Sequence, residues 1–428
     1  MLLPVEYEKK HFIKLKGVKD AQATHSAKPN SVKYQMKPIK SAQDLAINGA
    51  KPAFSHPLHV GRPNIGNREA FLKYVEEIFD RRWLTNNGPV VQEFEQKVAD
   101  LHKVKHCVAM CNGTVALEIA IRALGLEGEV IIPSYTFIAT AHALHWQGIT
   151  PVFADIDPVT HTLDPEAVRS MITPRTSGII GVHLWGNSAE TEALQAIADE
   201  HDLQLMFDAA HAFGCSRNGT MIGNFGACEV LSFHATKFFN TFEGGAVLTN
   251  DDELAETMRL MRNFGFSGRD NVIHPGTNGK MIEVSAAMGI VNLDAIDSVI
   301  EANRNNYHAY REALSTLPGI NLMAYDESEP KNYQYIVMEV SEECPVTRDK
   351  IIEALHAENI LARIYFWPGC HNMKPYKELY PHSGLLLPNT LQVADRVIVL
   401  PTGTAMDVDM VRKVTSVMRV LLTDIVPA

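Results

Sequence analysis

The chain lacks several features that would assign it to a common class of protein. No apolar run approaches the roughly 18 residues that a membrane-spanning helix requires. There is no surplus of positive charge either, since the formal net charge is −11. Nucleic acids and anionic membranes both select clustered positive charge, so neither is an expected partner. The first residues contain no long apolar segment of the kind found in signal peptides, and we expect a cytoplasmic protein.

Cysteine is scarce, and the motifs of several enzyme classes are absent. The six cysteines form no CxxC pair, which argues against a disulfide framework or a zinc site. There is no HExxH, no GxSxG and no GxGxxG that opens a βαβ unit. The carboxylates Asp155 and Asp157 fit either a metal site or a turn that ends a strand. Because Pro158 follows, the turn is the favoured interpretation, and we expect no metal.

Two chemically useful residues come shortly after apolar runs of strand-like length. Asp208 follows the run 203–207, and Lys237 follows the run 228–231 after a short polar segment. A pyridoxal-phosphate enzyme needs a lysine that forms an imine with the cofactor and a carboxylate that pairs with its pyridinium nitrogen. Taken alone, the lysine also fits a solvated surface charge, and the carboxylate also fits a helix cap. Together they predict an enzyme.

Strand-like and helix-like segments alternate through the middle of the chain, while 46% of all residues are hydrophobic and 21% are charged. This alternation predicts an α/β fold with a mostly parallel sheet that helices cover on both faces. In such sheets, ligands bind at the carboxyl ends of the strands. We expect a large cofactor-binding domain at 56–295 and a smaller C-terminal α+β domain at 296–428. Residues 1–55 are lysine-rich with little periodicity, and we expect an N-terminal extension or an arm packed on a partner subunit.

Other residues could complete a cofactor site. Asn112-Gly113-Thr114 precedes a helical pattern, and the N–H groups of a helix N-terminus can bind phosphate, although a capped helix without a ligand has the same pattern. Phe137 follows a strand-like run and could stack on a flat ring or belong to the core. His211 follows Asp208 by three residues and could reach the same cofactor, or it could pack as an ordinary buried histidine.

Together these segments resemble the DegT/DnrJ/StrS family of pyridoxal-phosphate-dependent sugar aminotransferases. The resemblance extends over roughly 60–425 in an ordered series of motifs. The matching segments are 112–125, 133–140, 153–158, 182–186, 208–214, 232–237 and 243–245. It implies the aspartate-aminotransferase fold, with a large domain, a small C-terminal domain, and a homodimer whose active sites are shared.

The resemblance also implies roles for individual residues. Lys237 matches the imine-forming lysine, and Asp208 matches the partner of the pyridine nitrogen. Phe137 matches the ring-stacking aromatic, and His211 the residue near the ring hydroxyl. Gly113, Thr114 and Ser232 match residues that bind the cofactor phosphate within one chain. Asn278 matches an asparagine that reaches the phosphate from the other subunit. Lys280 stands where the family commonly has arginine, which keeps the charge but loses a bidentate fork.

The implied reaction moves an amino group from L-glutamate to a keto sugar, with pyridoxamine phosphate as the intermediate form of the cofactor. The usual acceptor is a nucleotide-linked 4-keto- or 3-keto-6-deoxy sugar, and the segment 363–371 resembles part of the acceptor pocket. An aminotransferase acting on an inosose or another non-nucleotide keto sugar is an alternative. Two further alternatives are a sugar dehydratase of this fold and a non-catalytic sensor. The dehydratase usually has histidine at the position of Lys237, so the lysine argues against it. A sensor need not retain Lys237, Asp208 and Thr114 together, so their joint presence argues against a sensor.

Overall fold

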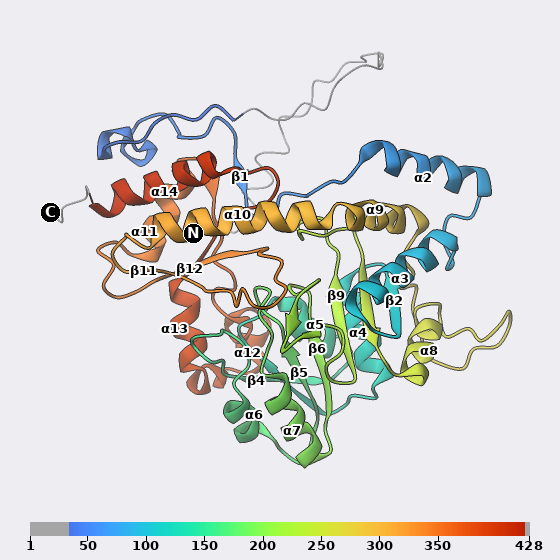
Figure 1. Ribbon diagram of the computed structural model, residues 1–428. Coiled ribbons are helices and arrows are strands. Elements are labelled where there is room, and N and C mark those ends of the chain that lie inside the picture. The colour runs from blue at the N-terminus through green and yellow to red at the C-terminus, as the bar shows by residue number, and fades with distance from the viewer. Residues whose placement is uncertain (1–33, 424–428) are drawn as a thin grey trace. The chain divides into compact units, whose positions relative to one another are not determined.

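The centre of the fold is a seven-stranded sheet, seen in the computed structural model, which describes residues 34–423 (Figure 1). Only β10 runs against its neighbours, so the sheet is mostly parallel, as the sequence predicts. In spatial order the strands are β2 (His106–Met110), β10 (Gly245–Thr249), β9 (Cys228–Ser232), β6 (Gln204–Asp208), β5 (Thr176–Val182), β3 (Glu129–Pro133) and β4 (Thr150–Ala154).

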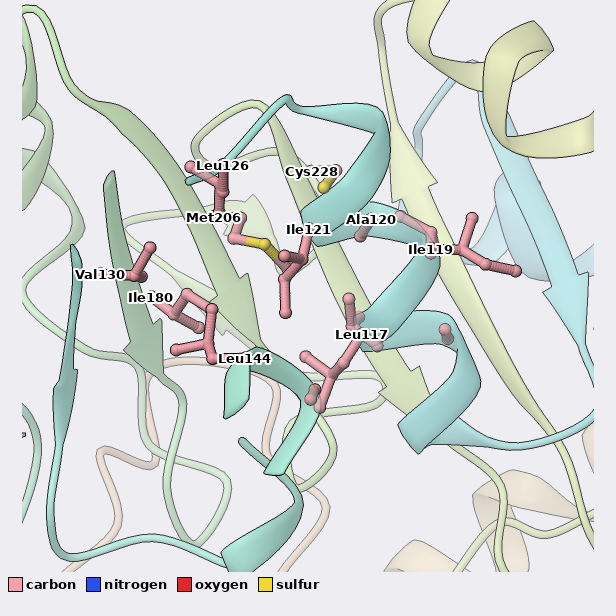
Figure 2. Packing of buried hydrophobic residues seen from close by; sticks show 14 of the residues in the cluster. Leu117, Ile119, Ala120, Ile121, Leu126, Val130, Leu144, Ile180, Met206 and Cys228 are labelled. Atoms are coloured by element: carbon pink, nitrogen blue, oxygen red, sulfur yellow. The ribbon is translucent and has the colours of Figure 1, made fainter. Parts of the chain in front are cut away.

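Helices bury both faces of this sheet, which explains why its strands are continuous apolar runs. Alternate residues of a strand point to opposite faces. Val108 and Met110 therefore share a cluster with α4 (Gly113–Ala123), α5 (Ile138–His145) and α8 (Asp252–Met261). Figure 2 shows Leu117 and Ile121 of α4 beside Met206 and Ile180 from the strands.

The opposite face is covered in two parts. Cys107 and Ala109 pack with α2 (Arg68–Arg81), α3 (Pro89–His102) and α9 (Glu283–Asp294). Ile131 and Ile179 pack with α6 (Pro165–Met171) and α7 (Thr191–His201). A hairpin of β7 (Ser216–Arg217) and β8 (Thr220–Met221) lies between β6 and β9 in the chain.

The C-terminal part contains a three-stranded antiparallel sheet in the order β11 (Ile320–Leu322), β12 (Ile336–Val340) and β14 (Val397–Leu400). Ala295 separates α9 from α10 (Ile296–Leu314), at the position where the sequence places the domain boundary; that division stays a prediction. The other elements here are α11 (Arg348–Ala357), β13 (Ile360–Leu361), η4 (Cys370–Asn372), α12 (Tyr376–Leu379), η5 (Ser383–Leu386), α13 (Pro388–Arg396) and α14 (Val408–Thr423).

The two carboxylates after β4 serve the backbone. Asp155 accepts hydrogen bonds from the N–H groups of Asn389 (2.9 Å) and Thr390 (2.8 Å) in the first turn of α13. Asp157 accepts from the N–H groups of Val159 and Thr160 in a tight turn. Asp157 therefore stabilises its own turn, whereas Asp155 caps α13, a helix far away in the sequence.

The described part of the predicted N-terminal extension packs against the C-terminal part of the chain. Two short 3₁₀ helices, η2 (Ala42–Asp44) and η3 (Ala46–Asn48), precede β1 (Leu58–His59), which pairs in parallel with β13. The buried Glu358 carboxylate accepts hydrogen bonds from the N–H groups of Ala46 (2.5 Å) and Ala53 (2.6 Å). Residues 1–33 lie outside the described residues.

No helix between residues 34 and 423 is both long enough and apolar enough to cross a bilayer.

We predict that Glu358→Gln lowers the free energy of unfolding by about 2 kcal/mol, because the amide places an N–H₂ donor against one of two backbone donors. Equilibrium urea denaturation measures this change. Glu353→Gln is the matched control, since Glu353 lies on the same helix with an exposed side chain paired to Lys350 (3.0 Å). Equal, small effects of the two substitutions would contradict the predicted role of Glu358.

Candidate active site

Asp208 and Lys237 lie at the carboxyl edge of the large sheet. Asp208 is the last residue of β6, and Lys237 follows the neighbouring parallel strand β9. The proximity of Asp208 raises the pKa of the Lys237 amine, but burial outweighs it and lowers that pKa to about 8. About a tenth of this amine is therefore uncharged at pH 7, far more than for a lysine of ordinary pKa, which suits a proton-transferring group.

The Asp208 carboxylate is buried, with 6% of the residue exposed, and its orientation is fixed. Oδ2 accepts a hydrogen bond from Thr140 Oγ1 at 2.8 Å, and Oδ1 accepts from the N–H of Ala210 at 3.1 Å. Burial raises the pKa of Asp208, while these hydrogen bonds and the Lys237 charge oppose that increase. A buried carboxylate of this kind is well suited to a cationic partner such as a protonated ring nitrogen.

The start of α4 is confined by neighbouring backbone and has the geometry of an anion site. Asn112 caps the helix by accepting from the N–H of Val115 at 2.9 Å, which leaves the N–H groups of Gly113 and Thr114 free of intrahelical bonds. A Cβ atom on Gly113 would lie 2.9 Å from Ser232 Cβ, and one on Gly245 would lie 2.6 Å from Gly113 N. Only glycine therefore allows this close approach, and the residues present fit a phosphate group.

Phe137 and His211 differ in their exposure to solvent. Phe137 is 58% exposed at the N-terminus of α5, so it is not a core aromatic. His211 is buried, and its ring stacks on Trp185 at 5.7 Å between centroids. Burial and the nearby Lys237 hold the pKa of His211 well below its usual value. His211 therefore lies beside Lys237, while the roles of both Phe137 and His211 toward a cofactor stay predictions.

Asn278 and Lys280 lie beside the candidate phosphate site at the start of α4, but in the described part of the chain their side chains bind none of the residues of that site. Residues 278–280 lie close to the start of α4, since the N–H of Cys111 donates a hydrogen bond to Gly279 O at 2.8 Å. Within residues 34–423, the exposed Asn278 side chain makes no hydrogen bond to Gly113, Thr114 or Ser232. Lys280 Nζ donates to Asn263 Oδ1 at 3.0 Å and lies 4.6 Å from the centre of the Phe264 ring. The role of Asn278 toward a second chain stays a prediction.

The segment 363–371 contacts the aromatic residues of the site from the C-terminal part. Phe366 stacks on Trp185 at 5.3 Å between centroids, and its ring centre is 6.4 Å from that of Phe137. His371 Nδ1 lies 2.7 Å from Ser134 Oγ, directly after β3. This segment therefore forms one wall of the site.

Sequence reasoning missed three residues of the site. Thr140 orients Asp208, Tyr335 places its hydroxyl 3.4 Å from Lys237 Nζ, and Gln334 Oε1 accepts from the N–H of Phe238 at 3.3 Å. Tyr335 and Gln334 immediately precede β12, almost 100 residues after the lysine. The only signal was a cluster of polar and aromatic residues, 332–335, before an apolar strand.

Comparison with known proteins defines the class. The model of the DegT/DnrJ/EryC1/StrS aminotransferase family matches residues 66–419. A dTDP-4-amino-4,6-dideoxy-D-glucose transaminase of Shigella dysenteriae is 37% identical over 85% of this chain and 98% of its own length. A GDP-perosamine synthase of Caulobacter vibrioides is 35% identical over 75% of this chain and 87% of its own length.

Solved structures agree with this assignment. DesI, crystallised in the presence of its TDP-sugar product, is 48% identical with a TM-score of 0.86, covering 90% of this chain and 97% of DesI. PseC of Helicobacter pylori, an aminotransferase of pseudaminic acid biosynthesis, is 26% identical with a TM-score of 0.79, covering 85% and 99%.

The chain belongs to the DegT/DnrJ/EryC1/StrS aminotransferase family. It is an aminotransferase with the aspartate-aminotransferase type of fold, and pyridoxal phosphate is its cofactor. The predicted family, fold, enzyme class and cofactor are thereby confirmed.

Proposed function

We propose that this enzyme transfers the amino group of L-glutamate to the keto carbon of a nucleotide-linked 6-deoxy sugar, with C4 of a dTDP-linked 4-keto sugar as the first candidate. The likeness to DesI, which was crystallised with its TDP-sugar product, carries this choice. The dTDP-sugar transaminase of Shigella dysenteriae supports it. GDP- or UDP-linked sugars, the 3-keto isomers and inososes are the alternatives that the experiment includes.

In this proposal each residue of the site has a separate task. Gly113, Thr114 and Ser232 hold the cofactor phosphate, Phe137 covers one face of the ring, and His211 lies near its ring hydroxyl. Asp208 keeps the ring nitrogen protonated. Pyridoxal phosphate supplies an electron sink and carries the amino group between the two substrates. Lys237 binds the cofactor covalently and, once released, moves a proton with its uncharged amine.

We propose that the enzyme works as a homodimer in the cytoplasm, in a biosynthetic pathway for amino sugars of lipopolysaccharides or antibiotics. Large apolar side chains are exposed, among them Phe79 in α2, Trp83 shortly after it and Phe242 in the loop after Lys237. A second copy of the chain would cover them. The six cysteines are all unpaired, which is usual in a reducing compartment.

The substrate class can be tested directly. We expect the purified enzyme, given L-glutamate, to aminate one dTDP-linked 4-keto-6-deoxy sugar much faster than the GDP, UDP, 3-keto and inosose compounds of the same panel. Mass spectrometry identifies the product, and the Lys237→Ala variant serves as the inactive control. Turnover only with a non-nucleotide acceptor would refute the proposed substrate class.

Replacing Asp208 tests the charge beside the ring nitrogen. Asp208→Asn keeps the size and an acceptor oxygen but removes the negative charge, so we expect kcat to fall on the order of a hundredfold with a smaller effect on cofactor retention. Asp155→Asn is the matched control, since Asp155 is also a buried carboxylate after a strand of this sheet but holds α13. We expect this control to lower stability rather than proton transfer. Near-normal turnover of Asp208→Asn would show that another group serves the ring nitrogen.

A mixture of inactive chains tests the shared site. Lys237→Ala removes the lysine from the site of its own chain. Asn278→Asp places a negative charge beside the cofactor phosphate in the site of the partner chain. Random exchange should restore about a quarter of the sites, because half of the dimers are mixed and each has one intact site. We therefore expect about a quarter of wild-type activity after subunit exchange. Confirmed exchange between folded, dimeric variants without recovery would contradict the role of Asn278.

A further inference from the structure

A line of hydrogen-bonding groups connects the backbone behind the site with the Lys237 amine. The N–H of Trp185 lies 3.4 Å from His211 Nδ1, and His211 Nε2 lies 3.0 Å from Tyr335 Oη. Tyr335 Oη in turn lies 3.4 Å from Lys237 Nζ. His211 and Tyr335 are both buried, with 6% and 8% of the residue exposed, so protein atoms set their hydrogen bonds.

The direction of these bonds follows from the first of them. A backbone N–H can only donate, so His211 Nδ1 is an acceptor. Burial keeps the imidazole neutral by lowering its pKa, and a neutral ring carries its single proton on the other nitrogen. Nε2–H therefore donates to Tyr335 Oη. The hydroxyl proton of Tyr335 is then free to be donated, and Lys237 Nζ is the remaining partner that the structure gives this hydroxyl.

The hydroxyl distinguishes between the two protonation states of Lys237. An uncharged amine has a lone pair and can accept the Tyr335 proton. A charged ammonium group has no lone pair, so Tyr335 Oη would accept from both Lys237 and His211 while its own proton loses this partner. The arrangement therefore favours the uncharged amine.

We propose that Tyr335 is a positioning residue of this aminotransferase, which favours the uncharged form of Lys237 by donating its hydroxyl proton to Nζ. The inference rests on the proposed role of Lys237. Asp208, His211 and Tyr335 are the titratable groups that interact with this amine. The Asp208 charge favours the ammonium form, and so does the Tyr335 ring, whose centre lies 6.0 Å from Nζ and which Tyr335→Phe retains. Gln334 keeps Tyr335 in place, because its Oε1 accepts from the N–H of Phe238, next to the lysine.

The test measures the pKa of Lys237 in the full-length, cofactor-free protein. Competitive labelling with acetic anhydride at a series of pH values, followed by peptide mass spectrometry, gives the pKa of this single amine. We expect Tyr335→Phe to raise it by about half a pKa unit or more, the effect of one hydrogen bond of ordinary net strength. Tyr310→Phe is the matched control, since the fully buried Tyr310 hydroxyl donates to Pro401 O at 3.0 Å, away from the lysine.

An unchanged or lowered pKa in Tyr335→Phe, with Tyr310→Phe equal to wild type, would overturn the proposal. If Tyr335→Phe fails to fold, His211→Phe gives the second test. This substitution removes the competing donor from Tyr335 Oη, so the oxygen accepts more readily from the ammonium group and the pKa of Lys237 should again rise; no rise would overturn the proposal. Borohydride reduction of cofactor-loaded wild type tests the role of Lys237 separately. The absence of an adduct on Lys237 would refute that role, while the labelling would still show whether Tyr335 controls the amine.

Discussion

The structure depends on a buried carboxylate and an amine that influence each other at one edge of a sheet. Burial raises the pKa of Asp208 and lowers that of Lys237, and each charge partly offsets the burial of the other. The parallel strands β6 and β9 bring the two residues to the same edge. Thr140 and the Ala210 N–H then fix the carboxylate, so the sheet supplies the position and the loops supply the hydrogen bonds. Helix packing on both faces gives this edge a rigid support.

The residues of the large sheet could be predicted because their signals are local. Each strand is an apolar run buried on two faces, and Asp208 and Lys237 were predicted from their positions after such runs. Gly113 follows β2 and Ser232 ends β9, and these strands are the two neighbours of β10, whose first residue Gly245 approaches Gly113 closely. The functional roles of these residues stay predictions, whereas the family, fold and cofactor are confirmed.

Tyr335, Gln334 and Glu358 could not be predicted because their partners are far away in the sequence. Tyr335 is 98 residues from Lys237, and Glu358 is more than 300 residues from the N–H groups that it binds. A tyrosine before a strand and a glutamate at the end of a helix are common in any soluble chain. Their importance arises from the way in which the C-terminal part docks on the sheet, and no local pattern describes that docking.

The tight contacts of the segment after β1 limit how far the chain can be shortened from its beginning. The Asn64 Nδ2–H₂ group donates to Phe238 O at 3.0 Å, next to the lysine, while Asn64 Oδ1 accepts from Thr404 Oγ1 at 2.7 Å. A Cβ atom on Gly61 would lie 2.8 Å from Thr236 O. Composition alone would assign residues 1–55 to a dispensable leader. They continue into residues 61–64, which connect the loop that carries Lys237 with the C-terminal part. Lys37 already contributes to this part of the fold, because its N–H donates to Ala53 O at 2.9 Å, and a chain trimmed beyond Lys37 loses that hydrogen bond.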